Sequence, residues 1–182
     1  MKRTAIYTFA FIALAALAMA QMKRTQNNSK SPARDTSVTI AGKKIEISYS
    51  APSVRGRKIF GEGGQVSGDP TYPVWRAGAD EATTIHTEAP LDIKGLAVPA
   101  GYYTLWVDVG SNPWQLVVNK QTGQWGTDYD KSKDLGRVSM TITKPGAPIE
   151  TYKMTLASEG GNRGKLTLEW ENFIASVPFT VK

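Results

Sequence analysis

Apolar and polar residues alternate along most of the chain beyond residue 35, which is the pattern of β-strands with one buried face. Two such runs, 36–41 and 44–50, flank Gly42-Lys43 and predict a hairpin whose second strand buries Ile45, Ile47 and Tyr49. Later runs repeat the alternation, with these apolar positions: Tyr103, Leu105, Val107 and Val109; Trp114, Leu116 and Val118; Val138, Met140 and Ile142; Tyr152, Met154 and Leu156; Leu166, Leu168 and Trp170; Val177, Phe179 and Val181.

No stretch shows sustained helical spacing, and Gly, Pro, Asn and Asp cluster between the runs, where they favour turns. Roughly nine or ten short strands with such turns are typical of an antiparallel β-sandwich or its jelly-roll-like relative. The sequence therefore predicts an all-β fold.

Two segments, 51–73 and 121–133, lack the alternation and are predicted to be long loops. The first contains Arg55-Gly56-Arg57-Lys58, and the second contains Trp125-Gly126. A connection of about 20 residues without regular structure is uncommon in a compact domain and is more often functional than idle. Both loops are therefore candidates for a site.

The amino terminus has the features of an export signal. Lys2 and Arg3 precede an uncharged apolar run over 5–18, and Ala18-Met19-Ala20 provides the small residues that signal peptidase requires before Gln21. The run is shorter than the roughly 20 residues that span a bilayer, which favours cleavage over a membrane anchor. We expect a signal peptide over 1–20, a flexible polar leader over 21–34 and one domain over 35–182, in the periplasm or secreted, with no stable membrane anchor after cleavage.

The net charge of +6 is concentrated near the amino terminus. Residues 35–182 hold 16 basic and 16 acidic side chains, so the predicted domain is neutral. Nucleic-acid binding requires a surplus of Lys and Arg on the folded surface and is therefore not expected. The chain has no Cys, and a domain of this size does not need disulfides to fold.

The segment 74–84 places an aromatic residue, a cation and two adjacent acids between strand-like runs. One interpretation is structural: Arg76 and Glu81 form a buried ion pair that orders the segment. The other is functional: Arg76, together with the arginines of the 51–73 loop, presents forked donors to a carboxylate or phosphate, and Trp75 forms an apolar wall. Both interpretations make this segment the centre of the candidate site.

Several motifs occur together in one order: 53–61 with Arg-Gly-Arg-Lys-Ile-Phe-Gly, 74–84 with Trp-Arg-Ala-Gly-Ala-Asp-Glu-Ala-Thr, 99–106 with Pro-Ala-Gly-Tyr-Tyr-Thr-Leu-Trp, and Trp125-Gly126. The chain resembles an exported bacterial family known only as a domain of unknown function, in which Asn or Asp stands at the position of Asp80. The resemblance covers about residues 32–182. It implies export and a shared cluster of site-like residues, and it implies no activity.

His86 is the only histidine, and alternation over 83–87 places it on the polar face of its strand. A metal site built from Asp80, Glu81 and His86 would offer one imidazole and no thiolate, so neither a metal nor another cofactor is predicted. Asp80 and Glu81 are adjacent and point to opposite sides of an extended chain, which weakens a shared acid-base role. A nucleophile elbow and a phosphate loop are both absent from the sequence.

The run 102–106 allows two interpretations. Tyr102, Thr104 and Trp106 share the face opposite Tyr103 and Leu105. Exposed rings on that face would suit the apolar side of a sugar, whereas the simpler interpretation is that the face packs beneath a loop or a second sheet.

The leading hypothesis is a non-catalytic binding module for a small polar, anionic or carbohydrate ligand, with no catalytic residue. The alternatives are a hydrolase that uses Asp80, Glu81 or His86, and a structural or partner-binding domain; the sequence leaves the oligomeric state open. The candidate binding residues are Arg55, Arg57, Lys58, Trp75, Arg76, Asp80, Glu81 and His86.

Overall fold

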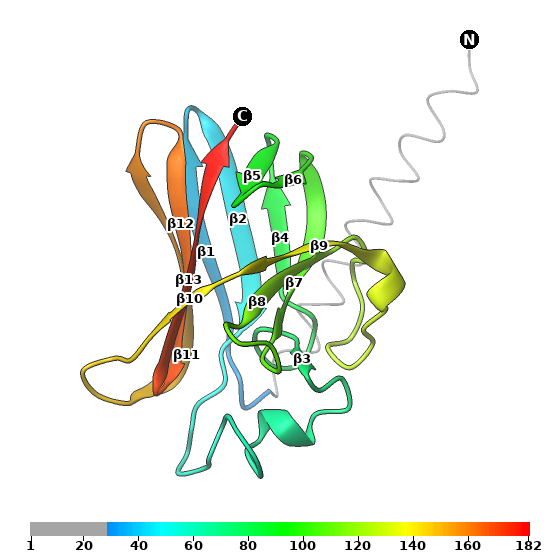
Figure 1. Ribbon diagram of the computed structural model, residues 1–182, viewed down its shortest axis with the longest axis vertical. Coiled ribbons are helices and arrows are strands. Elements are labelled where there is room, and N and C mark those ends of the chain that lie inside the picture. The colour runs from blue at the N-terminus through cyan, green and yellow to red at the C-terminus, as the bar shows by residue number, and fades with distance from the viewer. Residues whose placement is uncertain (1–28) are drawn as a thin grey trace.

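The computed structural model describes residues 29–182, and the expected signal peptide over 1–20 and most of the leader lie outside them. The fold is an antiparallel β-sandwich without α-helices in the described range, which confirms the predicted fold class (Figure 1). The elements are β1 (Ala33–Ile40), β2 (Lys43–Ser50), η2 (Val66–Gly68), β3 (Val74–Trp75), β4 (Thr84–Thr87), β5 (Leu91–Ile93), β6 (Leu96–Val98), β7 (Gly101–Asp108), β8 (Gln115–Asn119), η3 (Lys131–Lys133), β9 (Asp134–Ser139), β10 (Thr141–Thr143), β11 (Ile149–Gly160), β12 (Arg163–Glu171) and β13 (Phe173–Val181).

One sheet has the order β1-β2-β4-β7-β8-β9, with β3 paired to β7. The other has the order β11-β12-β13-β5-β6, with β10 paired to β13. Neighbouring strands run antiparallel. Along the strands, residues that face the core alternate with polar residues that face outward, as the sequence pattern predicts. The sandwich core lies between these faces.

The core contains the apolar positions that the alternation predicted. Ile45 and Ile47 of β2 are fully buried, as are Val107 of β7 and Val177 of β13. One end of the core is aromatic, and each of its rings lies within 6 Å of at least one other, centroid to centroid, in mostly edge-to-face pairs: Phe60, Trp75, Trp114, Tyr152, Trp170 and Phe173. Such pairs contribute about 0.5–1.5 kcal/mol each beyond the burial of their area.

The predicted single strand around Val138, Met140 and Ile142 is divided in the structure. β9 ends at Ser139 in the first sheet, and β10 begins at Thr141 in the second. The chain therefore crosses the sandwich at Met140, which is buried, and Figure 1 shows β9 leading into β10 across the molecule. Alternation continues through the crossing, so the sequence pattern does not reveal the change of sheet.

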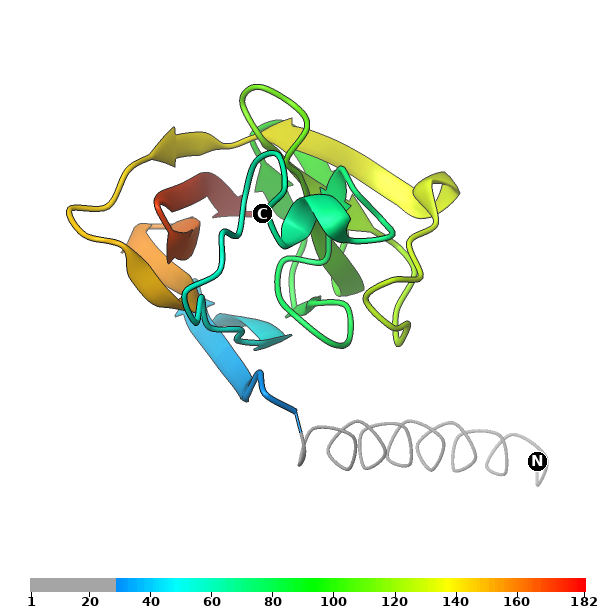
Figure 2. The ribbon, with the colours of Figure 1, turned by 90° about the horizontal axis from the view of Figure 1, so that it is seen from below.

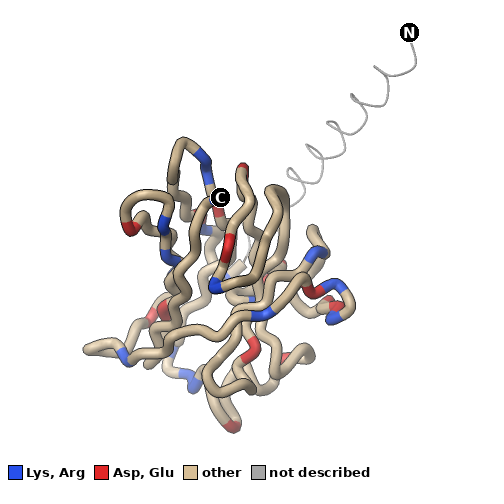
Figure 3. Tube along the Cα trace, turned by 45° about the horizontal axis from the view of Figure 1, so that its top comes forward, with Lys and Arg blue, Asp and Glu red and all other residues tan. Residues whose placement is uncertain are grey.

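The described chain contacts the sandwich before the expected domain start at residue 35. β1 begins at Ala33, and the backbone N–H of Ala51 donates to the carbonyl of Pro32 at 2.9 Å. Acidic and basic side chains are intermixed along the strands and loops, as expected from their equal numbers (Figure 3). No helix within residues 29–182 is long and apolar enough to cross a membrane.

Candidate functional site

The 51–73 loop lies across one end of the sandwich (Figure 2), and its Phe60 belongs to the aromatic cluster of the core. Ile59 is fully buried and Phe60 nearly so, and the Phe60 ring packs against Trp75 and Trp170. The N–H of Ile59 donates to the carboxylate of Glu171 at 3.0 Å. The middle of the loop is thus fixed by apolar anchors, and the polar residues on either side of it are held in place.

The turn after β3 is shaped by two residues in the left-handed backbone region, Ala77 (φ 51°) and Asp80 (φ 59°). The indole N–H of Trp75 donates to the carbonyl of Gly78 at 3.0 Å, and this bond closes the turn. A Cβ atom at position 78 would lie 2.9 Å from the carbonyl oxygen of Ser50, so the close approach of this turn to β2 requires glycine. Non-glycine residues in this region are uncommon and concentrate at functional sites.

A pocket of about 210 Å³ lies where this turn faces the 51–73 loop. Its lining comes from five segments: the amino-terminal residues before β1, the loop, β3, the turn after β3, and β12. The lining residues are Ser31, Pro52, Arg57, Gln65, Val66, Asp69, Trp75, Arg76, Gly78, Ala79, Asp80 and Trp170. The pocket therefore joins the 51–73 loop to the 74–84 segment, and the sequence predicts both as parts of a site.

Arg76 forms its ion pair with Asp69 of the loop, whereas the sequence suggested Glu81 as its partner. Both side chains of this pair are only 12% exposed. Asp69 also accepts hydrogen bonds from the N–H and the hydroxyl of Thr71, so the carboxylate is fixed from both sides. The pair ties the loop to the turn across the pocket.

Gly126 closes the other side of Arg76. Its N–H donates to the carbonyl of Asp80 at 2.9 Å, and a Cβ atom there would lie 2.3 Å from the Cδ atom of Arg76. Only glycine lets the 121–133 loop pass this close to the arginine stem. The backbone of the neighbouring Trp125 forms an isolated β-bridge with Glu81, so the Trp-Gly motif is held to the site through its backbone and Gly126.

Arg57 and Asp80 line the pocket without an ion-pair partner among residues 29–182. The Arg57 guanidinium donates to three neutral oxygens: the carbonyls of Val54 and Ser53 at 3.0 and 2.7 Å, and the side-chain oxygen of Gln65 at 3.2 Å. The Asp80 carboxylate accepts a hydrogen bond from the hydroxyl of Ser29.

The remaining candidate residues lie outside the pocket lining. Arg55 is exposed and donates to the carbonyl of Lys30, and Lys58 donates to the carbonyl of Glu62. His86 lies on β4, opposite Tyr102 of β7, and the two rings stack at 4.1 Å. Among residues 29–182 there is no group of three or more His, Cys, Asp or Glu side chains that could hold a metal ion.

Sequence reasoning missed Asp69, Gln65, Ser31 and Trp170 as pocket residues. Alternation predicts Trp170 in the core, and the residue is buried there while it also borders the pocket. Asp69 precedes Pro70 in a turn-like stretch of the 51–73 loop. Its acidic side chain, in a loop that is already a candidate for a site, is the one sequence feature that points to it.

The 121–133 loop covers part of the outer face of the first sheet. Thr104 and Trp106 are fully buried, and the Trp106 ring lies 4.9 Å from that of Tyr129. Tyr102 alone in this row is exposed, at 57%. The face therefore packs beneath a loop, and the alternative of an exposed aromatic row is wrong for Trp106.

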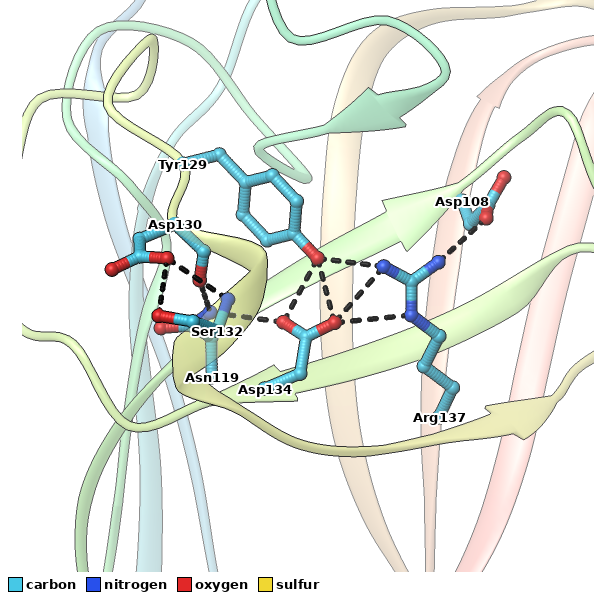
Figure 4. A network of polar contacts seen from close by, with 7 residues as sticks. All are labelled: Asp108, Asn119, Tyr129, Asp130, Ser132, Asp134 and Arg137. Atoms are coloured by element: carbon cyan, nitrogen blue, oxygen red, sulfur yellow. Dashed lines mark hydrogen bonds and ion pairs between the residues drawn. The ribbon is translucent and has the colours of Figure 1, made fainter.

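A polar network fixes this loop to the sheet edge (Figure 4). Arg137 of β9 donates to the carboxylates of Asp108 and Asp134 at 2.7 and 2.9 Å and to the hydroxyl oxygen of Tyr129 at 2.7 Å. Tyr129 in turn donates to Asp134, and Asn119 donates to the same carboxylate at 2.9 Å. The guanidinium of Arg137 is shared by two carboxylates, and each charged group has a bonded partner, so the network is a structural clamp.

Replacement of Tyr129 is expected to change how the free energy of unfolding depends on pH in the alkaline range. Burial, followed by the hydrogen bond to Asp134 and the charge of that carboxylate, raises the pKa of Tyr129 well above its usual value. A raised folded-state pKa contributes stability that is fully present below the unfolded pKa of about 10 and is lost as the pH rises through the folded pKa. In Tyr129→Phe the free energy of unfolding should therefore fall less steeply above about pH 10.

Urea denaturation at about pH 9 and about pH 11 measures this difference. Tyr72→Phe is the matched control, because it makes the same replacement at a site that is 50% exposed. Equal slopes for wild type and Tyr129→Phe would contradict the assignment.

The fold and the site define an all-β sandwich domain with a small charged pocket at one end. The model of the family described as "Protein of unknown function (DUF2911)" matches residues 31–179, and the chain belongs to this family. This confirms the resemblance to a domain of unknown function. No curated protein and no solved structure matches the chain.

Proposed function

We propose that this protein is a non-catalytic binding module for a small polar ligand held in the pocket between the 51–73 loop and the turn after β3. The observation that carries the proposal is the pocket itself, about 210 Å³, with Arg57, Asp69, Arg76 and Asp80 in its lining. Binding sites combine apolar walls with a few fixed polar groups, and here two buried indoles border the charged side chains.

The hydrolase alternative receives less support from the geometry. Of its three proposed residues, only Asp80 lines the pocket, while His86 stacks on Tyr102 on the strand face. A structural or partner-binding role would be favoured by a flat apolar patch formed by these loops, and they instead surround a polar pocket. The export signal expected over 1–20 makes the periplasm or the exterior the proposed location.

A thermal-shift screen of the mature protein against sugars, amino acids, phosphates, carboxylates and divalent metals tests the proposal. A ligand of the pocket at about 100 times its Kd stabilises the folded state by about 2.7 kcal/mol. In Ala79→Leu the larger side chain should occupy part of the pocket, because Ala79 lines it, and the shift should be lost.

The matched control is Ala97→Leu, the same replacement at an exposed position on β6. It should keep the full ligand-induced shift. A shift that survives in Ala79→Leu would place the ligand elsewhere, and a screen without any shift would contradict a binding function.

A further inference from the structure

The pocket lining contains two acidic and two basic side chains, and only one acid and one base form an ion pair. Asp69 and Arg76 neutralise each other in their ion pair. This leaves one cation, Arg57, and one anion, Asp80, whose hydrogen-bond partners within residues 29–182 are all neutral groups. Among residues 29–182, the pocket thus presents one charge of each sign without an opposite charge bonded to it.

Each of these two groups retains capacity for a ligand. A guanidinium has five N–H donors, and the bonds of Arg57 to Val54, Ser53 and Gln65 use three of them. The Asp80 carboxylate has about four acceptor positions, and the Ser29 hydroxyl occupies one. Both side chains are also held in place, Arg57 by its three bonds and Asp80 by the closed turn to which it belongs.

We propose that the ligand is a small zwitterion of the class of free α-amino acids, with its carboxylate on Arg57 and its ammonium group on Asp80. This inference rests on the proposed function of the pocket. Arginine binds carboxylates through two parallel N–H bonds, and charge-assisted bonds are about twice as strong as neutral ones. A simple anion would satisfy Arg57 and leave Asp80 facing a like charge, whereas a neutral sugar would leave both charges uncompensated.

The amino-terminal segment supplies the third element of the site. The hydroxyl of Ser29 donates to Asp80, and Arg55 holds the neighbouring carbonyl of Lys30 at 2.5 Å. An ammonium group is a stronger donor to a carboxylate than a hydroxyl. The ammonium group of the ligand therefore binds at the acceptor positions that Ser29 leaves open on Asp80. A volume of about 210 Å³ corresponds to about seven waters at roughly 30 Å³ each, which suits one amino acid.

The test uses the mature protein and the twenty free L-amino acids as probes, by thermal shift and then by calorimetry. The amino acid with the largest shift is compared with its N-acetyl derivative, which lacks the ammonium charge, and with its carboxamide, which lacks the carboxylate. Each derivative should bind about 10- to 100-fold more weakly, because each loses a charge-assisted bond.

Two variants assign the charges to residues. Asp80→Asn should weaken binding of the amino acid by a similar factor. It should also remove most of the difference in affinity between the amino acid and its N-acetyl derivative. Asn adopts the left-handed backbone of position 80 readily, so this variant should fold. Arg57→Gln should in the same way remove most of the difference between the amino acid and its carboxamide. Arg163→Gln is the matched control, because Arg163 is exposed on β12 and lies outside the pocket lining, and it should preserve both differences.

The other outcomes overturn the inference and separate it from the proposed function. A sugar that binds more tightly than every amino acid and is lost in Ala79→Leu would overturn the zwitterion and keep the binding function. Acetate or phosphate that binds in wild type and in Asp80→Asn but not in Arg57→Gln would identify an anion site instead. Failure of all these probes would overturn both. If a variant fails to fold, the derivative comparison in wild type decides alone.

Discussion

Trp75→Ala is expected to lower the free energy of unfolding by about 3–5 kcal/mol. Trp75 is 4% exposed, and its ring packs against Phe60, Tyr152 and Trp170. Truncation removes the apolar area of an indole and leaves a cavity that the neighbouring rings cannot fill without moving. It also removes the indole N–H that closes the turn on Gly78.

Equilibrium urea denaturation measures this loss, and Trp125→Ala is the matched control. Trp125 is 41% exposed, so its removal should change the unfolding free energy little, within about 0.5 kcal/mol for a surface site. Similar losses in the two variants would mean that the aromatic cluster around Trp75 does not anchor the loop and the turn.

The strands could be predicted because a period of two relates sequence directly to burial. The hairpin of β1 and β2 and the buried rows of β7, β8, β12 and β13 follow this rule. The short strands β3, β5 and β6 hold two or three residues each, too few for a pattern to emerge. Which sheet a strand joins was also hidden, as the crossing at Met140 shows.

The pocket could be predicted only in part. Arg57, Arg76 and Asp80 were candidates, and the structure brings them to one pocket because both segments are anchored on the same aromatic cluster. The partner of Arg76 could not be foreseen, since irregular backbone gives no rule that relates spacing to distance. The left-handed conformations of Ala77 and Asp80 turn the chain where the residue types do not demand it. Asp69 lies seven positions before Arg76 in the sequence and contacts it only through the fold of the loop.

Arg76→Met is expected to lower the free energy of unfolding by about 3–5 kcal/mol, because it leaves the Asp69 carboxylate buried without its cation. The side chains are 12% exposed, so water screens the pair only weakly. Met keeps much of the length of the arginine stem, which packs against Gly126, so the effect reports the charge more than the volume.

A double-mutant cycle decides whether the pair or the packing carries this loss. Asp69→Asn alone should also destabilise, whereas the double variant Arg76→Met with Asp69→Asn should cost much less than the sum of the two single changes, since no unpaired charge remains. Lys165→Met is the matched control: its ion pair with Glu159 is 43% and 37% exposed, and breaking it should change stability little. Additive losses at positions 76 and 69 would show that the loop and the turn are held together by packing alone. In that case both Arg76 and Asp69 would be available to a ligand, and the pocket would offer two more charges for recognition than the ion pair allows.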